Sequence, residues 1–429
     1  MRNMGETKIH NSHASPLTHA SPRALRAGGL RSRRGAAVKK GWQTKTLGDV
    51  AVVGAGNSAP QEEALFEDGT IPFFRTADAG RVRFGDIAES TDYLNDKGVK
   101  GLRRFAPGTI LFPKSGASTF LNHRVMLGVE GCVSSHLATI VADEKQAHPR
   151  FLLYFLSTVA AQDLVQDHAY PSLNLPTIAG IEVHLPPLAE QQRIVGLLDE
   201  AFEGLATAKA NAEKNLQNAR ALFESHLQSV FAQRGPGWVE KRFDEVCAIT
   251  STLVDPRKKE FLDLTHIGAG NIESMTGVLV DLKTAREECL ISGKFLFDES
   301  MVLYSKIRPY LMKVARPDFE GLCSADMYPL APIPNVVTRD YLFHLLLSKH
   351  FTDYAIQGSA RAGMPKVNRE HLFEFRVWLP DVNKQNQLAA NLDSLHEETR
   401  RLSRLYERKL VLLEALKKSL LHQAFTGEL

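Results

Sequence analysis

Apolar residues recur at helical spacing over two long stretches of this chain, about residues 189–233 and 384–424. Intervals of four and three alternate, as in a coiled-coil seam. The first stripe consists of Ile194, Leu198, Ala201, Leu205, Ala208, Ala212, Asn215, Ala219, Leu222 and His226. The second consists of Leu388, Leu392, Leu395, Thr399, Leu402, Tyr406, Lys409, Leu413, Leu416 and Leu420. At ~1.5 Å per residue each helix would be roughly 60–70 Å long, and we expect the two to pack together as an antiparallel coiled coil.

The segments before these helices have a different pattern. Short apolar runs of β type alternate with turn signals over residues 42–184 and 238–378, and each segment has one helical stretch near its end, at 150–166 and 339–357. The pattern predicts an α+β fold with two globular domains built on mixed, curved sheets. The predicted order is a basic leader (1–41), a first domain (42–184), a helix (185–235), a second domain (236–378) and a last helix (379–429).

The whole unit of domain and helix is repeated, giving a pseudo-two-fold plan. The segment that starts at Pro186 returns 194 residues later at Pro380, and Asn174 matches Asn368 in the same register. Upstream the register drifts, but Lys114 still matches Lys306 at the end of a β-type run. Duplication of a domain and its helix explains a period of this length, and it predicts a molecule that contacts two similar objects.

Composition narrows the functional class. The chain has 429 residues, 44% of them hydrophobic, and a formal net charge of only +3, so bulk charge does not indicate nucleic acid. Its four cysteines (Cys132, Cys247, Cys289, Cys323) are scattered, which predicts free thiols in a reducing cytoplasm. No apolar run is long enough for a membrane span. Residues 1–41 hold nine Lys or Arg and one acidic residue, and we expect them to be disordered or to precede the true start.

Basic and polar residues gather where loops are predicted, and they are the candidates for DNA contact. Arg and Lys neutralise phosphates, while Arg, Asn and Ser can hydrogen-bond base edges. Taken singly, any of them could equally be a solvated surface charge, but the repeat favours the matched pairs. The candidates in the first domain are Arg75, Arg81, Arg83, Lys114, Ser115, Ser118 and Asn174. Those in the second are Arg257, Lys258, Lys306, Arg308, Arg361, Lys366 and Asn368.

Catalytic motifs are weak or absent in the sequence. Gly54-Ala-Gly56 follows a β-type run as in a dinucleotide-binding fingerprint, but Pro60 and a polar stretch follow instead of a helix, and a turn is predicted there. The sequence has no phosphate-binding loop for ATP, no Asn- or Asp-Pro-Pro-Tyr/Phe methylase motif and no His-Glu-x-x-His. Cys132 and His136 alone would make a poor metal site. We therefore expect a chain without catalytic residues and without a metal site.

These features together resemble the DNA-specificity subunit of a type I restriction–modification system. The most specific segments are the helix start at Leu185–Val195, its degraded copy at Leu379–Gln385 and the ending at Leu420–Leu429. The resemblance implies two target-recognition domains that each read half of a split double-stranded DNA sequence, with the helices as a ruler between the halves. It also implies two modification subunits that carry S-adenosylmethionine and methylate adenine N6, and motor-nuclease subunits that use ATP and Mg²⁺. No cofactor is expected in this chain.

Two other functions remain open. A coiled-coil scaffold that binds only proteins would be indifferent to salt, whereas DNA binding weakens steeply with salt. A nucleotide-dependent enzyme would have to use Gly54-Ala-Gly56.

Overall fold

The computed structural model describes residues 39–169, 171–359 and 365–429. It divides into two compact units, Met1–Val195 with His422–Leu429, and Gly196–Leu421. Each unit contains one domain and its own part of the long helices. The predicted leader lies mostly outside the described residues, and so does Arg361.

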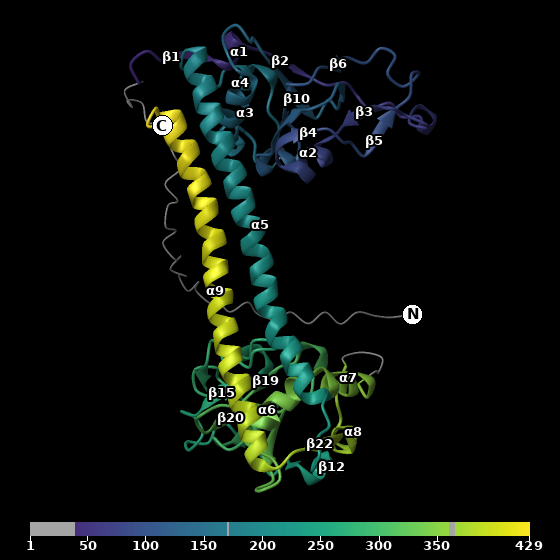
Figure 1. The fold of residues 1–429 in the computed structure, drawn as a ribbon, viewed down its shortest axis with the longest axis vertical. Helices are drawn as coiled ribbons and strands as arrows, with labels where there is room; N and C mark the ends of the chain where they lie inside the picture. The colour runs from purple at the N-terminus through teal and green to yellow at the C-terminus, as the bar shows by residue number, and fades with distance from the viewer. Residues whose placement is uncertain (1–38, 170, 360–364) are drawn as a thin grey trace, which may run out of the picture. The chain divides into compact units, whose positions relative to one another are not determined.

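The first unit is built on two mixed sheets (Figure 1). One has the strand order β2-β10-β7-β8-β4 and is antiparallel except for the parallel pair β4/β8. The other has the order β5-β3-β9-β6, with β3 parallel to β9. The strands of the first sheet are β2 (Ala51–Ala55), β4 (Phe84–Ile87), β7 (Ile110–Pro113), β8 (Arg124–Leu127) and β10 (Leu137–Ala142). Those of the second are β3 (Ile71–Phe74), β5 (Asp92–Leu94), β6 (Arg104–Phe105) and β9 (Gly131–Val133).

Helices and short turns complete the first unit. A separate antiparallel ribbon joins the start of the domain to the residues just before the first long helix. The helix α3 starts at Pro149, where a missing N–H costs nothing, and buries Phe151 and Leu152. The remaining elements are β1 (Gln43–Thr46), β11 (Glu182–Leu185), α1 (Leu47–Val50), α2 (Thr76–Val82), α3 (Pro149–Thr158), α4 (Leu175–Ala179), η1 (Glu63–Leu65), η2 (Ala117–Leu121) and η3 (Ala161–Asp163).

The second unit repeats most of this topology, with one strand fewer in the first sheet and the additional edge strand β14 in the second. The order β13-β21-β18-β19 corresponds to β2-β10-β7-β8, and β16-β15-β20-β17, with β15 parallel to β20, corresponds to β5-β3-β9-β6. The strands are β12 (Val239–Arg242), β13 (Cys247–Ala248), β14 (Leu253–Val254), β15 (Thr265–Ile267), β16 (Lys283–Thr284), β17 (Lys294–Phe297), β18 (Val302–Ser305), β19 (Val314–Ala315), β20 (Gly321–Ser324), β21 (Met327–Pro332) and β22 (Arg376–Leu379). The mixed sheets and helices confirm the predicted α+β class.

The helices of the second domain differ in detail from the prediction. The stretch predicted as one helix is two, because Ser348 adopts an extended backbone and its side chain caps the second helix at Phe351 N. Asn368 caps the next helix in the same way. The helices are α6 (Arg339–Leu347), α7 (Lys349–Gln357) and α8 (Arg369–Glu374), with short turns η4 (Phe243–Glu245), η5 (Ala269–Asn271) and η6 (Pro309–Leu311).

A buried glutamine attaches each domain to the start of its long helix. Gln191 donates through Nε2 to the carbonyls of Pro186 and Gln146 and accepts from His148 N. Gln385 donates to Pro380 and Val336 and accepts from Thr338 N. Both side chains are fully buried. The second helix start had looked degraded in sequence, yet it keeps the residue that makes these contacts.

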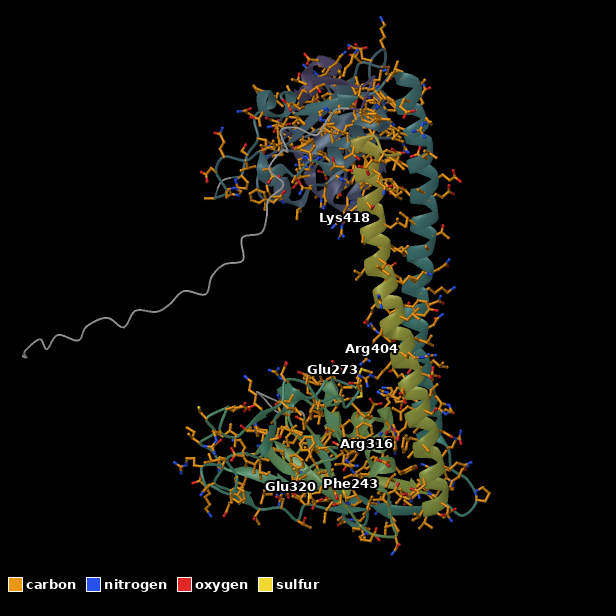
Figure 2. All side chains as sticks on the ribbon, turned by 90° about the vertical axis from the view of Figure 1, so that its left-hand side faces the viewer. Phe243, Glu273, Arg316, Glu320, Arg404 and Lys418 are labelled. Carbon is orange, nitrogen blue, oxygen red and sulfur yellow. The ribbon has the colours of Figure 1, made fainter. Side chains whose placement is uncertain are left out.

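The two long helices are α5 (Leu188–Ala232) and α9 (Val382–Thr426). Within the second unit they run antiparallel, because Lys209 pairs with Glu414 at 3.1 Å while Arg220, further along α5, pairs with Glu407 at 2.7 Å, earlier in α9. Figures 1 and 2 show the two lying side by side along this length. The predicted antiparallel coiled coil is confirmed.

The predicted stripe fails towards the end of α5. Ala212 and Ala219 are buried as expected, but Asn215, Leu222 and His226 are exposed. The inward positions there are instead Phe223, Leu227 and Val230. In α9, Leu402, Lys409 and Leu416 are likewise exposed. A straight helix drifts by ~20° per heptad against a strict seven-residue repeat, so an extrapolated stripe leaves the contact face.

The end of α9 belongs to the first unit. Phe425 packs edge-on against Phe151 and Phe155, with ring centroids 5.2 and 5.7 Å away. Arg193 donates to the Leu429 carbonyl at 2.8 Å. Among the described residues, no helix is both long enough and apolar enough to cross a membrane.

Candidate nucleic-acid interface

The matched lysines occupy equivalent junctions in the two units. Lys114 directly follows the buried strand β7, and Lys306 directly follows its counterpart β18. The backbone of Lys114 donates to His136 O and accepts from Leu173 N at 2.8 Å. The backbone of Lys306 donates to Asp326 O and accepts from Val367 N at 2.9 Å. In both units the loop after the central strand is therefore tied to the segment that leads to Asn174 or Asn368.

Each of those asparagines starts a short helix. The Oδ1 of Asn174 accepts from Thr177 N at 2.8 Å, and the Oδ1 of Asn368 accepts from His371 N at 2.7 Å. Capping alone explains why both positions hold asparagine. The cap uses only the side-chain oxygen, so the amide NH₂ of each remains a possible donor to a ligand.

In the second unit this junction gathers positive charge. Ile307 and Lys366 form an isolated β-bridge, and Arg308 N donates to Pro365 O at 2.9 Å. Lys366 and Arg369 stand close enough to lower the pKa of Lys306, in addition to the larger effect of burial, while Asp326 opposes them. Within the described part of the chain, Arg308, Lys366 and Arg369 face no carboxylate at ion-pair distance. The structure thus brings the predicted cations Lys306, Arg308 and Lys366 together with Asn368, and adds Arg369, which was not predicted.

Lys306 itself has a structural role. Its side chain is largely buried, donates to the Ala325 carbonyl, lies 3.8 Å from Asp326 and sits over the Tyr328 ring. Arg308, in contrast, is exposed and has a left-handed backbone with φ of 51°, which is uncommon outside glycine. Such conformations cluster at functional sites because the surrounding structure must hold them.

Sequence reasoning missed Arg369. It is the first residue of α8, where the helix dipole disfavours a cation. Its position directly after Asn368, which was a predicted DNA contact, was a signal in the sequence that could have identified it.

Two predicted arginines of the first domain are neutralised by nearby carboxylates. Arg75 pairs through Nε with Asp92 and lies over the Phe73 ring. Arg81 pairs with Asp78 at 2.7 Å. Asp78 is almost fully buried, and this desolvation raises its pKa. The hydrogen bonds that it accepts from Arg75 N and Thr91 N act in the opposite direction, and the pKa is lowered on balance. These two arginines therefore brace the segment around α2.

Arg83 is different. It ends α2 with φ of 66°, its side chain is exposed, and no carboxylate of the described chain pairs with it. The pKa of neighbouring His123 is lowered by burial and then by Arg83 and Arg124. Arg83 is therefore an available cation of the first domain, and His123 beside it is a second residue that sequence reasoning missed.

The serines of the first domain order their own loop. Ser118 Oγ donates to the Ser115 carbonyl at 2.9 Å, and Ser115 forms an isolated bridge with Ser172. Phe120 stacks on His168 at 5.6 Å. The loop after Lys114 is thus fixed by local contacts.

The Arg257–Lys258 pair lies just after β14, an edge strand of the other sheet in the second domain. Arg257 makes two hydrogen bonds to Asp255, at 2.9 and 2.8 Å, and these lower the pKa of Asp255 to about 2. Lys258 is exposed. The charge of Arg257 is therefore already compensated.

The glycine pair of the possible nucleotide site has a packing role. Gly54 lies inside β2 and so is not in the turn that was predicted. A Cβ on Gly56 would stand 1.9 Å from the Val133 carbonyl oxygen, because Asn57 bridges Ser134 there. The next helical turn is η1, well beyond, so the strand–glycine–helix arrangement of a dinucleotide site is not formed.

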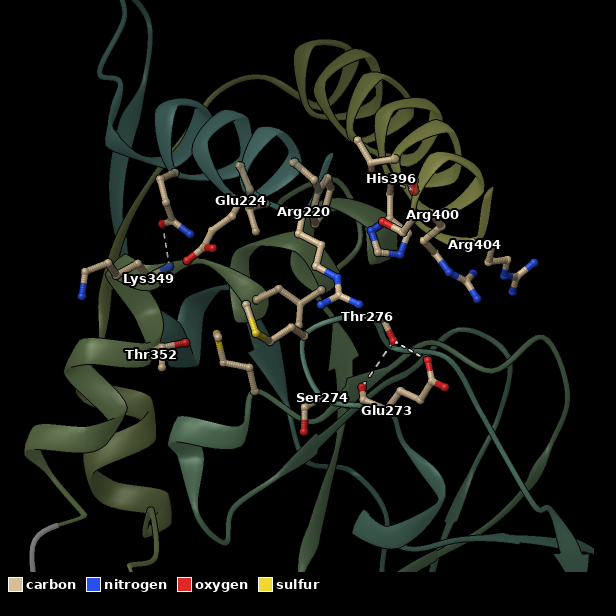
Figure 3. A pocket seen from close by; sticks show the side chains of 18 of the residues that line it. Arg220, Glu224, Glu273, Ser274, Thr276, Lys349, Thr352, His396, Arg400 and Arg404 are labelled. Carbon is tan, nitrogen blue, oxygen red and sulfur yellow. Dashed lines mark hydrogen bonds between the residues drawn. The ribbon is translucent and has the colours of Figure 1, made fainter. Parts of the chain in front are cut away.

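A pocket of about 620 Å³ lies in the second unit between α5, α9, α7 and the loop 273–276 (Figure 3). Several of its charges are mutually paired, as in Arg220–Glu407 and Lys349–Asp353. His396 packs edge-on against Phe223 at 4.5 Å, and burial lowers its pKa to about 4. No group of three potential metal ligands occurs among the described residues.

Comparison with known proteins identifies relatives along nearly the whole chain. A family model described as type I restriction modification DNA specificity domain matches residues 39–216 and 236–408. The EcoDI specificity subunit of Escherichia coli is 26% identical over 423 residues, which cover 90% of this chain and 88% of that protein. The MjaIX specificity subunit of Methanocaldococcus jannaschii is 30% identical over 171 residues, 39% of each chain.

Solved structures share the fold. A chain from a study of complex assembly and conformational transition of the type I R-M system matches with a TM-score of 0.69 at 17% identity, covering 91% of this chain and 99% of that one. The HsdS subunit from Thermoanaerobacter tengcongensis matches with a TM-score of 0.58 at 18% identity, covering 91% and 98%.

Proposed function

Because the chain belongs to the family of type I restriction–modification DNA specificity domains, we propose that it is the subunit that selects the DNA sequence for such a complex. Its target would be a bipartite double-stranded sequence, one half read by each domain. The observation that carries this proposal is the duplicated junction, in which Lys114 and Asn174 correspond to Lys306 and Asn368 in contacts as well as in sequence.

The charges of the described residues suggest how each half would be read. In the second domain Arg308, Lys366 and Arg369 supply unpaired cations beside a capped helix start, which suits phosphate contacts and, for Arg308, a base edge. In the first domain Arg83 supplies an exposed cation that pairs with no described carboxylate. Arg75, Arg81 and Arg257 would support recognition indirectly, by bracing loops through their carboxylate partners.

The helices would set the separation of the two half-sites and hold the partner subunits. In α9, Leu405 and Leu412 lie seven residues apart, hence on one face, and each is 56% exposed, while neighbouring Val411 is 68% exposed. A row of apolar residues this exposed suits a protein interface. We assign it to the two modification subunits, with motor-nuclease subunits joining for restriction.

The chemistry would then belong to the partners. In this proposal the chain is a non-catalytic cytoplasmic subunit, and S-adenosylmethionine, ATP and Mg²⁺ are bound by the modification and motor-nuclease subunits. The packing role of Gly56 supports this division of labour, because it removes the motif that most resembled a nucleotide site.

The test is to map methylated adenine across the host genome with and without this gene. We expect a motif with two defined halves and an undefined spacer to lose methylation when the gene is deleted and to regain it on complementation. A methylome that does not change would overturn the proposal.

The salt dependence of DNA binding distinguishes this proposal from a scaffold that binds only proteins. Binding of the assembled complex to its target should weaken steeply between 50 and 200 mM salt, by about 10³-fold or more if six or more phosphates are contacted. Binding that does not respond to salt would favour the scaffold.

A further inference from the structure

One carboxylate of α9 holds two cationic or hydrogen-bonding side chains of the second domain. Asp393 accepts from Arg316 Nη2 and from His344 Nε2, the latter at 2.7 Å. Arg316 follows β19, and His344 lies in α6. These residues connect the sheet and a helix of the domain directly to the long helix. Figure 2 marks Arg316 on the side of the domain that faces α9.

The protonation of His344 is set by its surroundings. The side chain is 1% exposed, and burial lowers its pKa even though Asp393 acts in the opposite direction. Its Nδ1 is buried and has no hydrogen-bond partner among the described residues. A neutral ring with the proton on Nε2 fits this geometry, because protonation would add a buried donor at Nδ1 without an acceptor.

Arg316 extends the cluster in two directions. Its Nη1 donates to Asp340 Oδ1 at 2.6 Å, and its guanidinium lies over the Phe343 ring at 4.5 Å. Phe223 of α5 approaches the His344 ring at 6.4 Å. The clamp, defined here as Arg316, His344 and Asp393, therefore joins both long helices to one domain.

Two of the three clamp residues differ between the repeats, whereas Asp393 matches Asp199 in the 194-residue register. The matched contacts of Gln191 and Gln385 align the two domains. In this alignment Tyr154 of the first domain occupies the position of His344 in the second. The strand pairs β7/β8 and β18/β19 give a second alignment of the two domains. In it Met126 of the first domain occupies the position of Arg316 in the second. Methionine and tyrosine cannot form the same ion pair. The arginine and the histidine of the clamp are thus particular to the second domain.

We propose that Arg316, His344 and Asp393 are positioning residues that hold the second recognition domain in one orientation on α9, so that the complex accepts a single spacer length. The inference rests on the proposed function. Buried charge-assisted hydrogen bonds have narrow geometry, so they restrict rotation of a domain more than apolar contacts do. A reader free to rock on its helix would reach half-sites displaced by one base pair.

The experiment measures methyl transfer by the complex assembled with its modification subunits, on DNA duplexes with the cognate spacer and with one base pair more or fewer. Asp393→Asn keeps the shape and an acceptor for His344 but removes the ion pair. We expect discrimination between cognate and altered spacers to fall by about tenfold, since misplacement of ~1 Å can change a rate by up to 10²-fold. The cognate rate should change far less.

The matched control is Asp340→Asn, which removes the other ion pair of Arg316 and leaves the clamp intact; its discrimination should equal that of the wild type. An Asp393→Asn complex that loses rate in parallel on all duplexes, or keeps its discrimination, would overturn the proposal. If this variant does not fold, Arg316→Met provides the same test, with methionine as in the first domain.

A second measurement is independent of DNA. Hydrogen exchange of α6 amides in the wild-type complex and in each variant should accelerate for Asp393→Asn and not for Asp340→Asn. A wild-type complex that methylates none of the duplexes would count against the proposed function. Faster exchange in α6 would still support the clamp in that case, and unchanged exchange would refute it.

Discussion

The two recognition domains share a framework but use their charges differently. In the first domain, Arg75 forms an ion pair with Asp92 and Arg81 forms one with Asp78, while Arg83 remains exposed. In the second, Arg308, Lys366 and Arg369 face no described carboxylate, whereas Arg316, on the side of α9, is paired twice. Duplication therefore fixed the strand order and the helix attachments, while the placement of acidic partners decides which cations are available to a ligand.

The largest expected difference concerns the cores. Phe243 packs against Phe351 and Phe375 with ring centroids 5.8 and 5.9 Å away, whereas the residue at its place in the first domain is Leu47. Phe243→Ala should lower the free energy of unfolding by about 3–5 kcal/mol, and Leu47→Ala by an amount near the lower end of about 2–5 kcal/mol. Urea unfolding followed by tryptophan fluorescence measures both. Equal losses would mean that the aromatic cluster adds nothing.

The helix attachments should behave alike in the two domains. Gln191→Leu and Gln385→Leu each leave a buried backbone N–H and two carbonyls without their partner. Each substitution should cost about 1–3 kcal/mol of unfolding free energy. Chemical denaturation of the two variants side by side provides the measurement. A large loss in only one of them would show that the matched contacts are not energetically equivalent.

The available and neutralised cations should differ in DNA binding. Lys366→Ala, or Arg361→Ala outside the described residues, should weaken binding of the assembled complex by about 1–3 kcal/mol if a base contact is lost. A pure phosphate contact would instead reduce the salt dependence. Arg81→Ala is the comparison, since Arg81 already pairs with Asp78. Titration of labelled target DNA at two salt concentrations measures the affinity and its salt dependence for each variant. Equal losses of affinity for Lys366→Ala and Arg81→Ala would contradict the difference between available and neutralised cations.

The smallest expected effect is on pH dependence. Burial lowers the pKa of His266, His344 and His396 in the second unit, and the same holds for His123 in the first. A histidine whose pKa is lowered by folding stabilises the protein above its unfolded pKa of about 6.5 and loses that contribution as the pH falls. Asp393, with a pKa of about 2, acts in the same direction below the unfolded value of about 3.9.

The second unit should therefore lose more stability than the first between pH 7 and 5.5. Urea midpoints at the two pH values check this, with Trp42 replaced by Phe so that the remaining fluorescence comes from Trp238 and Trp378 of the second unit. His344→Gln should reduce the pH dependence. Equal acid sensitivity of the two units would contradict the assignment of neutral buried rings.

Local patterns made the architecture predictable. The helical stripes of α5 and α9 and the alternation of β-type runs with turns depend on residues close in sequence, and they predicted the α+β class and the antiparallel helices. The matched pairs Lys114/Lys306 and Asn174/Asn368 also predicted equivalent junctions. Where the stripe was wrong, as at Leu222 and His226, a strict seven-residue repeat had been extended along a straight helix, which does not keep that repeat on its contact face.

Which cations are free was beyond sequence reasoning. Arg75 meets Asp92 only because β3 pairs with β5, and Arg316 meets Asp393 across 77 positions of sequence. A sequence lists charges but does not say which ones fold onto each other. Arg369 was overlooked because helix α8 was not predicted, although a cation at the positive end of a helix dipole is informative once that helix is known.

The exposed apolar residues of α9 have a consequence for the level to which this protein can accumulate in a cell. If Leu405, Val411 and Leu412 are covered only on assembly, chains made in excess of their partner subunits would expose this apolar surface. Such chains would aggregate with one another and be open to proteolysis. The supply of modification subunits would then limit how much of this protein accumulates in the cell. Overexpression of this chain by itself should give aggregated protein, and co-expression with the modification subunits should restore its solubility.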